Sequence, residues 1–314
     1  MTRYISKRLL AMLPVLFLVS FVVFMLLHLT PGDPALIMLG EEATPQNLAA
    51  LRHELGLDQP LPLQFLSWME HIVRGDLGRS IRTHQQVLEA IVERLPVTIE
   101  LTALAMIISL FIALPTGIIS ATRRNSFLDL FSTTGALLGI SMPNFFLAIL
   151  LIFIFAVTLR WLPPIGYTPI QKDLLENIRG MILPAITLGA AASAIVARLT
   201  RSSLLEVLSQ DYVRTAQAKG LAERTIIYTH ALKNAMIPVV TIIGLQIGAL
   251  IGGAVITETI FVLPGVGSLV VDSIFRRDYP LVQGAVLFIS IAHLFVNLVV
   301  DILYAFLDPR IRYA

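Results

Sequence analysis

The side chains that usually carry out catalysis or bind metals are few in this sequence, and they do not form a recognisable site. The six histidines lack metal-ligand spacing, and there is no cysteine to supply a thiolate. The sequence also has no HExxH, GxSxG, P-loop or GxGxxG motif. We therefore predict no catalytic residue and no metal or cofactor site in this chain, and expect another subunit to supply the energy for any active process.

Polar groups inside apolar segments are the next candidates, because each of them costs free energy in hydrocarbon. A carboxylate at the centre of a span costs about 2.5–3.5 kcal/mol on insertion scales. Glu100, Glu258 and Asp301 fall near the ends of apolar segments, where headgroup water would lower that cost. Asn144 and Gln246 lie within such segments. We expect these two amides to be candidates for the wall of a pathway.

The composition requires that lipid be part of the solvent. Hydrophobic residues make up 56% of the chain and charged residues 14%, against roughly 25% charged residues in a soluble domain. Since a transmembrane helix needs about 20 mostly apolar residues, the sequence predicts six spans, namely Leu9–Leu27, Val97–Ala121, Leu130–Val157, Ile182–Ala197, Met236–Glu258 and Leu281–Val300. The third is expected to be tilted or broken near Pro143. The fourth is short and rich in alanine, which suits a helix buried among others.

The distribution of Lys and Arg predicts the orientation of these spans. With the N-terminus inside, the inner segments hold more of these residues once the long loop after the first span is set aside. Loops of that length contribute little to the positive-inside rule. Both termini are therefore predicted to be cytoplasmic. The pI of about 9.0 reflects this inner face rather than a nucleic-acid site.

Two segments are predicted to lie outside. Residues 29–96 are expected to form a small helical cap, with one helix capped by Thr44 and another ending at Gly75. This cap either only covers the mouth of the bundle or contacts an extracytoplasmic partner. In the last outer loop, "LPGVG" predicts a tight turn, followed by a short helix over Ser268–Phe275.

The stretch "SQDYVRTAQAKGLAERTIIYTHALKNAMIP", from Ser209 to Pro238, is unusually polar for this chain. One apolar stripe of a helix runs into this stretch, because apolar side chains recur every four residues, at Leu204, Leu208, Tyr212 and Ala216. Gly220 is expected to end that helix, and a second helical pattern leads into the fifth span. The result is an elbow with an exposed bend. It is either an amphipathic hairpin on the inner leaflet or a helix that docks in a partner's groove.

This stretch resembles the inner loop of permease subunits of binding-protein-dependent ABC importers, whose pattern is E-A-A-x-x-x-G followed by I-x-L-P. Arg214-Thr215-Ala216 stands at E-A-A, Gly220 at the glycine and His230-Ala231-Leu232-Lys233 at I-x-L-P. Only the last alanine, the glycine and the leucine match, a departure that resembles the dipeptide, oligopeptide and nickel subfamily. Further segments occur in the order of the B-type permease of that subfamily along essentially the whole chain: "PGDPA", "LGLDQPLPLQF", "GDLGRSI", "SMPNFF", "ETIFVLPGVG", "RDYPLVQG" and "DPRIR".

The resemblance implies an all-α integral membrane protein of the type I ABC importer permease kind. Six transmembrane helices would carry an outer helical cap between the first and second and a cytoplasmic coupling helix between the fourth and fifth. The implied parts are residues 1–28 (N-terminus and first span), 29–96 (cap), 97–306 (permease core with coupling loop 198–235) and 307–314 (cytoplasmic tail). The residues that match the coupling region are Arg214, Thr215, Ala216, Lys219, Gly220, Leu221, Ala222, Glu223 and Arg224. Their implied role is mechanical, to carry motion from an ATPase to the spans.

The resemblance also implies partners in a bacterial or archaeal plasma membrane. A second homologous permease would complete the pathway, two ABC ATPase subunits would bind ATP and Mg, and an extracytoplasmic binding protein would deliver the substrate. Peptides are the first expectation for that substrate, with nickel or a nickel chelate, glutathione or another small solute as alternatives. A secondary transporter or channel without an ATPase is a competing hypothesis, but the sequence shows no clear internal repeat. An intramembrane enzyme is disfavoured because no catalytic pair is seen.

Overall fold

The computed structural model of the chain describes residues 2–29, 34–39, 43–54 and 56–307. Over these ranges the chain is almost entirely helical and has no β-strand, apart from an isolated bridge between Arg79 and Gln86. The expected cytoplasmic tail after Leu307, with its "DPRIR" motif, lies outside the described residues, as do the first three residues of "PGDPA".

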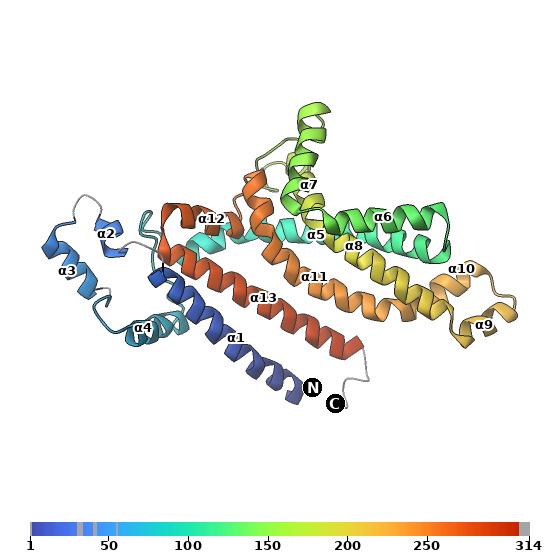
Figure 1. The fold of residues 1–314 in the computed structure, drawn as a ribbon, viewed down its shortest axis with the longest axis horizontal. Helices are drawn as coiled ribbons and strands as arrows, with labels where there is room; N and C mark the ends of the chain where they lie inside the picture. Colours follow the sequence, from blue (N-terminus) through green and yellow to red (C-terminus); the bar gives the residue numbers. More distant parts are fainter. Residues whose placement is uncertain (1, 30–33, 40–42, 55, 308–314) are drawn as a thin grey trace. The chain divides into compact units, whose positions relative to one another are not determined.

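Within the described ranges, five continuous helices are long and apolar enough to cross a membrane (Figure 1). They are α1 (Thr2–Leu29), α5 (Val87–Thr122), α8 (Leu174–Leu208), the continuous helix Glu223–Phe261, which includes α10 (Glu223–Thr225), a π-helical turn and α11 (Leu232–Phe261), and α13 (Tyr279–Leu307). A bent pair, α6 (Phe127–Ser141) and α7 (Asn144–Leu151) with the π-helical turn Ile152–Thr158, is the sixth membrane segment. The prediction of an all-α membrane protein is confirmed, with five continuous spans, or six if the bent pair is counted as one broken span.

The third predicted span is broken, at the proline that the sequence marks. The direction of the chain bends by 108° between α6 and α7. Met142 has extended backbone dihedrals (φ −80°, ψ 126°), because the ring of the following Pro143 disfavours the helical region for the residue before it. Pro143 in turn has the dihedrals of an N-cap and begins α7. The segment therefore consists of two short helices rather than one tilted rod.

The fourth predicted span, Ile182–Ala197, is too short, because α8 runs from Leu174 to Leu208. Hydropathy identifies the apolar part of a helix and not its ends, which depend on capping. The carboxylate of Asp173 accepts hydrogen bonds from the backbone N–H groups of Leu175 and Glu176 at 2.9 and 3.0 Å. These bonds satisfy free donors of the first turn and start the helix well before the apolar region.

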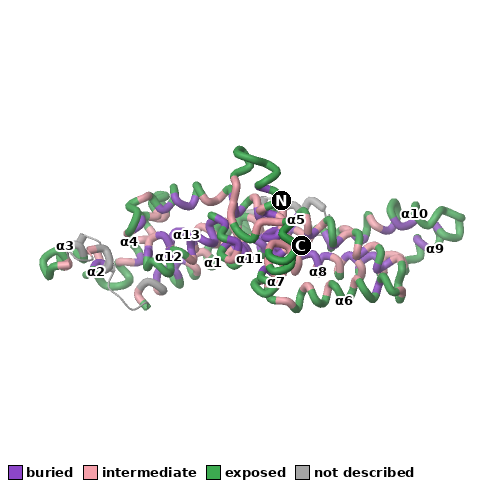
Figure 2. Tube along the Cα trace, turned by 90° about the horizontal axis from the view of Figure 1, so that it is seen from above, coloured by how far each residue is buried: buried purple, intermediate pink, exposed green. Residues whose placement is uncertain are grey.

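The described residues form two compact units. The first unit contains Val97–Pro264 and the chain from Phe295 onward, and its largest core cluster includes Leu101, Met181, Leu188 and Phe261. Among the membrane-spanning candidates of the described residues, α8 has the largest buried share, 67% of its apolar window, and buried residues alternate with half-buried ones along it (Figure 2). Gly189 of α8 faces the backbone of Ala105 in α5, where a Cβ would lie only 2.5 Å from the carbonyl oxygen.

The second unit contains Thr2–Pro96 and Gly265–Leu294. It holds the segment expected as a cap, with α2 (Pro34–Leu39), α3 (Pro45–Glu54) and α4 (Leu61–Val73). The predicted cap of α3 is confirmed, because the Thr44 hydroxyl accepts a hydrogen bond from the N–H of Asn47 at 3.2 Å. The short helix after "LPGVG" is also confirmed, as α12 (Val266–Arg276), slightly longer than predicted.

Candidate functional site

The polar stretch folds into an elbow at the junction of α8 with the helix that begins at Glu223. α8 ends at Leu208, and a separate short helix, α9 (Asp211–Ala218), follows. The prediction that one helix continues to Gly220 is therefore wrong. Ser209 caps α8 by donating to the carbonyl of Glu206 at 2.7 Å, and Gln210 is extended (φ −73°, ψ 150°). Local side-chain bonds of this kind compete with continued helix.

α9 is held in place by a small apolar contact. Val213 is fully buried and Ala216 is nearly so, and both pack with Ile226 and Leu208. The Tyr212 hydroxyl accepts a hydrogen bond from the Asn234 amide at 2.9 Å and donates one to the carbonyl of His230 at 3.3 Å. α9 is thus fixed to the first turns of the following helix, so its position and that of the helix depend on each other.

The bend after α9 is a Schellman motif centred on Gly220. The N–H of Gly220 donates to the carbonyl of Gln217 at 2.9 Å, and the N–H of Leu221 donates to that of Ala216 at 3.4 Å. Gly220 has φ +76°, a left-handed conformation that costs a residue with a Cβ roughly 1–2 kcal/mol. No atom outside the adjacent residues lies within 4 Å of an added Cβ, so the requirement for glycine is conformational rather than steric.

Most of the predicted coupling residues form the exposed surface of this elbow, which reaches from α9 to α10 (Figure 1). Arg214 and Thr215 lie on the outer side of α9, and Lys219 through Arg224 form the bend. Ala216 is the exception, since it is buried against Ile226. Arg214 has only an exposed ion pair with Asp211, at 3.6 Å, which stabilises little. The elbow therefore offers a short helix held by packing, with exposed charged side chains around it.

The two amides expected on a pathway are placed apart from the elbow. Asn144 is the first residue of α7, directly after the break, and Gln246 lies in the middle of α11; both are half-buried. Their assignment to a pathway stays a prediction.

The intramembrane carboxylates are less accessible than the sequence suggests. Glu258 is fully buried and accepts a hydrogen bond from the Thr98 hydroxyl at 2.6 Å, so headgroup water does not reach it in this structure. Glu100 accepts from the Tyr167 hydroxyl at 2.9 Å. Burial, together with the hydrogen bond to Glu100, raises the pKa of Tyr167 to about 12. Tyr167 therefore remains a neutral donor throughout the physiological range.

A buried ion pair links three helices of the first unit, and sequence reasoning missed it. Arg201 of α8 donates to both carboxylate oxygens of Asp129 in α6, at 2.8 and 2.9 Å. Ser120 of α5 and the N–H of Asn125 also donate to this carboxylate. The sequence signal was a carboxylate in the first turn of an apolar segment, but its partner lies 72 residues away along the chain.

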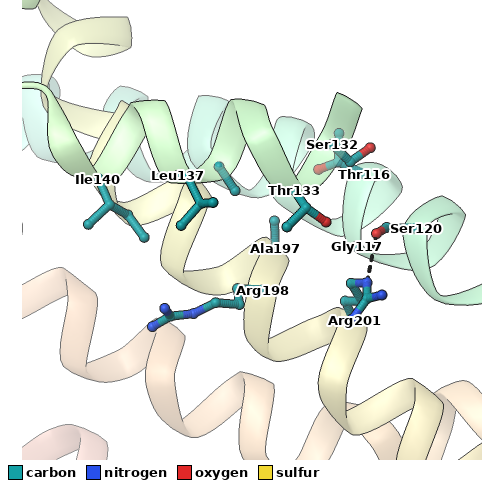
Figure 3. A pocket seen from close by; sticks show the side chains of 11 residues that line it. Thr116, Gly117, Ser120, Ser132, Thr133, Leu137, Ile140, Ala197, Arg198 and Arg201 are labelled. Atoms are coloured by element: carbon teal, nitrogen blue, oxygen red, sulfur yellow. Dashed lines mark hydrogen bonds between the residues drawn. The ribbon is translucent and has the colours of Figure 1, made fainter. Parts of the chain in front are cut away.

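A pocket of about 200 Å³ opens beside this pair, between α5, α6 and α8 (Figure 3). Ser120 and Arg201 stand at one end and Ile140 at the other, with Ala197 between. The lining is mostly apolar, and its guanidinium at Arg201 is already satisfied by Asp129. The pair is therefore a structural tie between helices. Among the residues that the structure describes, no cluster of three or more His, Cys, Asp or Glu side chains could hold a metal.

We expect Asp129→Ala to destabilise the protein by about 2–3 kcal/mol, because it leaves the Arg201 charge without a partner. The side chain of Arg201 is 29% exposed, which lowers the effect below that of a fully buried pair. The measurement is the melting temperature and yield of detergent-solubilised protein. As a control, Asp211→Ala removes an exposed carboxylate and should change neither quantity.

A double variant separates lost charge pairing from lost packing. Asp129→Leu with Arg201→Met removes both charges and should recover most of the melting temperature, since an apolar pair of similar volume can replace a buried ion pair. A double variant as unstable as Asp129→Ala would show that the hydrogen bonds to Ser120 and Asn125 matter more than the pair.

This architecture defines a class of protein: a helical membrane protein of several spans, with an exposed elbow before the longest span described. The family described as "Binding-protein-dependent transport system inner membrane component" matches residues 113–313, and the N-terminal domain of such membrane components matches residues 1–102. The chain therefore belongs to the family of binding-protein-dependent transport system inner membrane components.

Curated relatives match over their full lengths. A dipeptide transport system permease protein of Alkalihalophilus pseudofirmus is 44% identical over 333 residues, covering 100% of both chains. A glutathione transport system permease protein of Escherichia coli O6:H1 is 46% identical over 313 residues, again covering 100% of both. A crystal structure of an amino acid ABC transporter with histidines is similar in fold, with a TM-score of 0.50, 15% identity and coverage of 71% of this chain and 94% of that chain.

Proposed function

We propose that this chain is one of two permease subunits that form the translocation pathway of an ATP-driven importer of peptides. An extracytoplasmic binding protein delivers the substrate, and two cytoplasmic ABC ATPase subunits bind ATP and Mg and hydrolyse the ATP. The relatives' names support a peptide substrate, since one is a dipeptide permease and another transports glutathione, itself a short peptide. Nickel or another small solute carried by the same machinery is the alternative.

The observation that carries the proposal is the exposed α9 elbow. A short helix with a glycine bend, anchored through Tyr212 to the base of α11, fits the helix-in-groove mode of recognition. We assign coupling to the predicted residues from Arg214 to Arg224, with Ala216 as the buried support of the helix rather than a contact residue. If the α9 elbow faces the ATPase subunits, both termini are cytoplasmic and residues 29–96 are extracytoplasmic. Asn144 and Gln246 remain the proposed pathway residues.

The decisive test is uptake into proteoliposomes that contain this chain, the second permease and both ATPase subunits, with binding protein on the delivery side. Labelled dipeptide, glutathione and Ni²⁺ are offered separately. The proposal expects uptake of a peptide that requires ATP and both ATPase subunits. Uptake without the ATPase subunits would overturn it in favour of a secondary transporter. ATP-dependent uptake of Ni²⁺ alone would support an ATP-driven importer, but with nickel instead of a peptide as its substrate.

Charge changes on the loop after α4 should impair delivery of substrate. Arg74 pairs with Glu70, the Asp76 carboxylate accepts from the N–H of Gly78 at 2.9 Å, and both residues line one exposed pocket with Arg79. We expect Arg79→Glu to lower binding-protein-stimulated uptake several-fold while ATP hydrolysis without binding protein is unchanged. The two rates are measured in the same vesicles. Equal loss of both rates would mean that the segment had misfolded.

A further inference from the structure

α4 is strongly amphipathic, although it lies in a segment expected as an aqueous cap. At 100° per residue, its polar side chains fall within one arc of about 120°, in which Leu63 is the one apolar residue. These are Gln64, Ser67, Glu70 and His71, followed by the C-cap Arg74. The opposite, wider arc is apolar: Leu61, Phe65, Leu66, Trp68, Met69, Ile72 and Val73. In a cap surrounded by water, an apolar arc of this width would be expected only where the helix packs on a protein core.

The protein covers only part of that apolar arc. Phe65 is buried, whereas Leu66 and Val73 are 62% and 81% exposed. Phe65 packs against three rings of α1, with centroid distances of 5.7 Å to Phe17, 5.8 Å to Phe21 and 5.3 Å to Phe24. Figure 1 shows α4 beside α1 along this contact. The contact belongs to the second unit alone and so does not depend on how the two units are placed.

The position of these rings along α1 sets the depth of α4. The apolar span of α1 is Ser6–Met25, so all three phenylalanines lie inside it. Phe17 precedes the end of the span by about 12 Å, at 1.5 Å per residue. A side chain that touches Phe17 and Phe21 is therefore at the level of the hydrocarbon. The exposed surface of α1 around them is also apolar, including Leu18 and Val22.

The polar groups of α4 are compatible with this depth. A helix satisfies its own backbone hydrogen bonds, which any lipid-exposed segment must do. The Gln64 amide donates to the carbonyls of Leu57 and Gln59 at 3.2 and 2.8 Å, and its oxygen lies 3.0 Å from Nε2 of His28. Glu70 pairs with Arg74. The charged groups are thus confined to the polar arc, which can face the headgroups.

We propose that α4 is an interfacial helix that lies in the outer leaflet and binds acyl chains through the open part of its apolar arc, at Leu66 and Val73. Lipid is the occupant that the structure favours, because this arc continues the exposed apolar surface of α1 at the same depth. Burial of the apolar face of an amphipathic helix by about 5–10 Å is typical of such helices. The expected cap would then be attached to the membrane through α4.

The chain is well suited to a test by tryptophan fluorescence, since it contains only two tryptophans, Trp68 and Trp161. Both are replaced by phenylalanine, and a single tryptophan is introduced by Leu66→Trp or, as the matched control one position further along the helix, by Ser67→Trp. Each variant is assembled with its partner subunits in nanodiscs of brominated phosphatidylcholine, and in unbrominated discs with aqueous iodide. A second pair, Val73→Trp and His71→Trp, covers the case in which one variant fails to assemble.

The proposal expects bromolipid to quench the Leu66→Trp variant at least about twofold more than the Ser67→Trp variant, and iodide to show the reverse order. Equal iodide quenching of both would place α4 in water and overturn the proposal. Protection of the Leu66→Trp variant from both quenchers would also overturn it, since a protein partner would then cover the face. Neither reading depends on which substrate the transporter carries.

Discussion

Gly189→Val should remove nearly all folded protein from the membrane. An added Cβ at Gly189 would lie 2.5 Å from the carbonyl oxygen of Ala105 and 3.3 Å from its carbonyl carbon. Both contacts are to backbone within a helix, which cannot move aside as a side chain can. The two helices must separate, and the loss of their close packing costs about 3 kcal/mol or more. We expect the yield of monodisperse protein in size-exclusion chromatography to fall at least tenfold, since 1.4 kcal/mol corresponds to a factor of ten.

Gly135→Val is the matched control for this substitution. Gly135 is also in a membrane helix, α6, but no atom lies within 4 Å of a Cβ added there. The two variants share the change in helix propensity and differ in the clash alone. If Gly189→Val accumulated to the same level as Gly135→Val, the close approach of α8 to α5 would not be required for folding.

Gly220→Val should leave the protein folded and abolish most of its coupling to ATP hydrolysis. The left-handed conformation at φ +76° disfavours any side chain and most strongly a β-branched one. Nothing lies near an added Cβ, so the cost is confined to the bend. A penalty of roughly 1–2 kcal/mol lowers the ratio of native to displaced bend by about 5- to 30-fold. We expect co-purification of the ATPase and substrate-stimulated ATP hydrolysis to fall about tenfold at unchanged membrane abundance.

Gly220→Asn distinguishes backbone conformation from the simple addition of a side chain. Asparagine adopts the left-handed region more readily than other residues and also occurs at this position of helix C-termini. This variant should keep most of the stimulated activity. Full stimulation in Gly220→Val with the ATPase still bound would instead remove the elbow from coupling, and would favour a hairpin on the inner leaflet.

Local signals in the sequence predicted most of the helical architecture. Apolar runs identify the spans because hydrocarbon excludes polar side chains over a fixed thickness. Pro143 acts through its restricted backbone, and Gly220 through its freedom to adopt a positive φ. The ends of helices were predicted less well. Asp173 extends α8 outward, and Ser209 ends it before α9, in each case through side-chain hydrogen bonds that hydropathy does not register.

Contacts between distant segments could not be predicted from one sequence. The partner of Asp129 is 72 residues away and that of Thr98 is 160 residues away, and only the packing of the helices brings these side chains together. For the same reason the candidate site was predicted in part. The elbow lies within a continuous polar stretch and was found, whereas the buried support that Ala216 and Ile226 give it depends on the fold.

The uninterrupted helix from Glu223 to Phe261 has a mechanical consequence. At 39 residues it is about 58 Å long, a stiff rod on which a force applied near the elbow acts with a long lever arm. One weak point of this rod is Pro238, whose ring nitrogen cannot donate to the carbonyl of Asn234. Bending is therefore easier there, somewhat more than one third of the way along. A small rotation at this point moves the segment below it through several ångströms, while Glu258 at the opposite end stays fixed by its bond to Thr98.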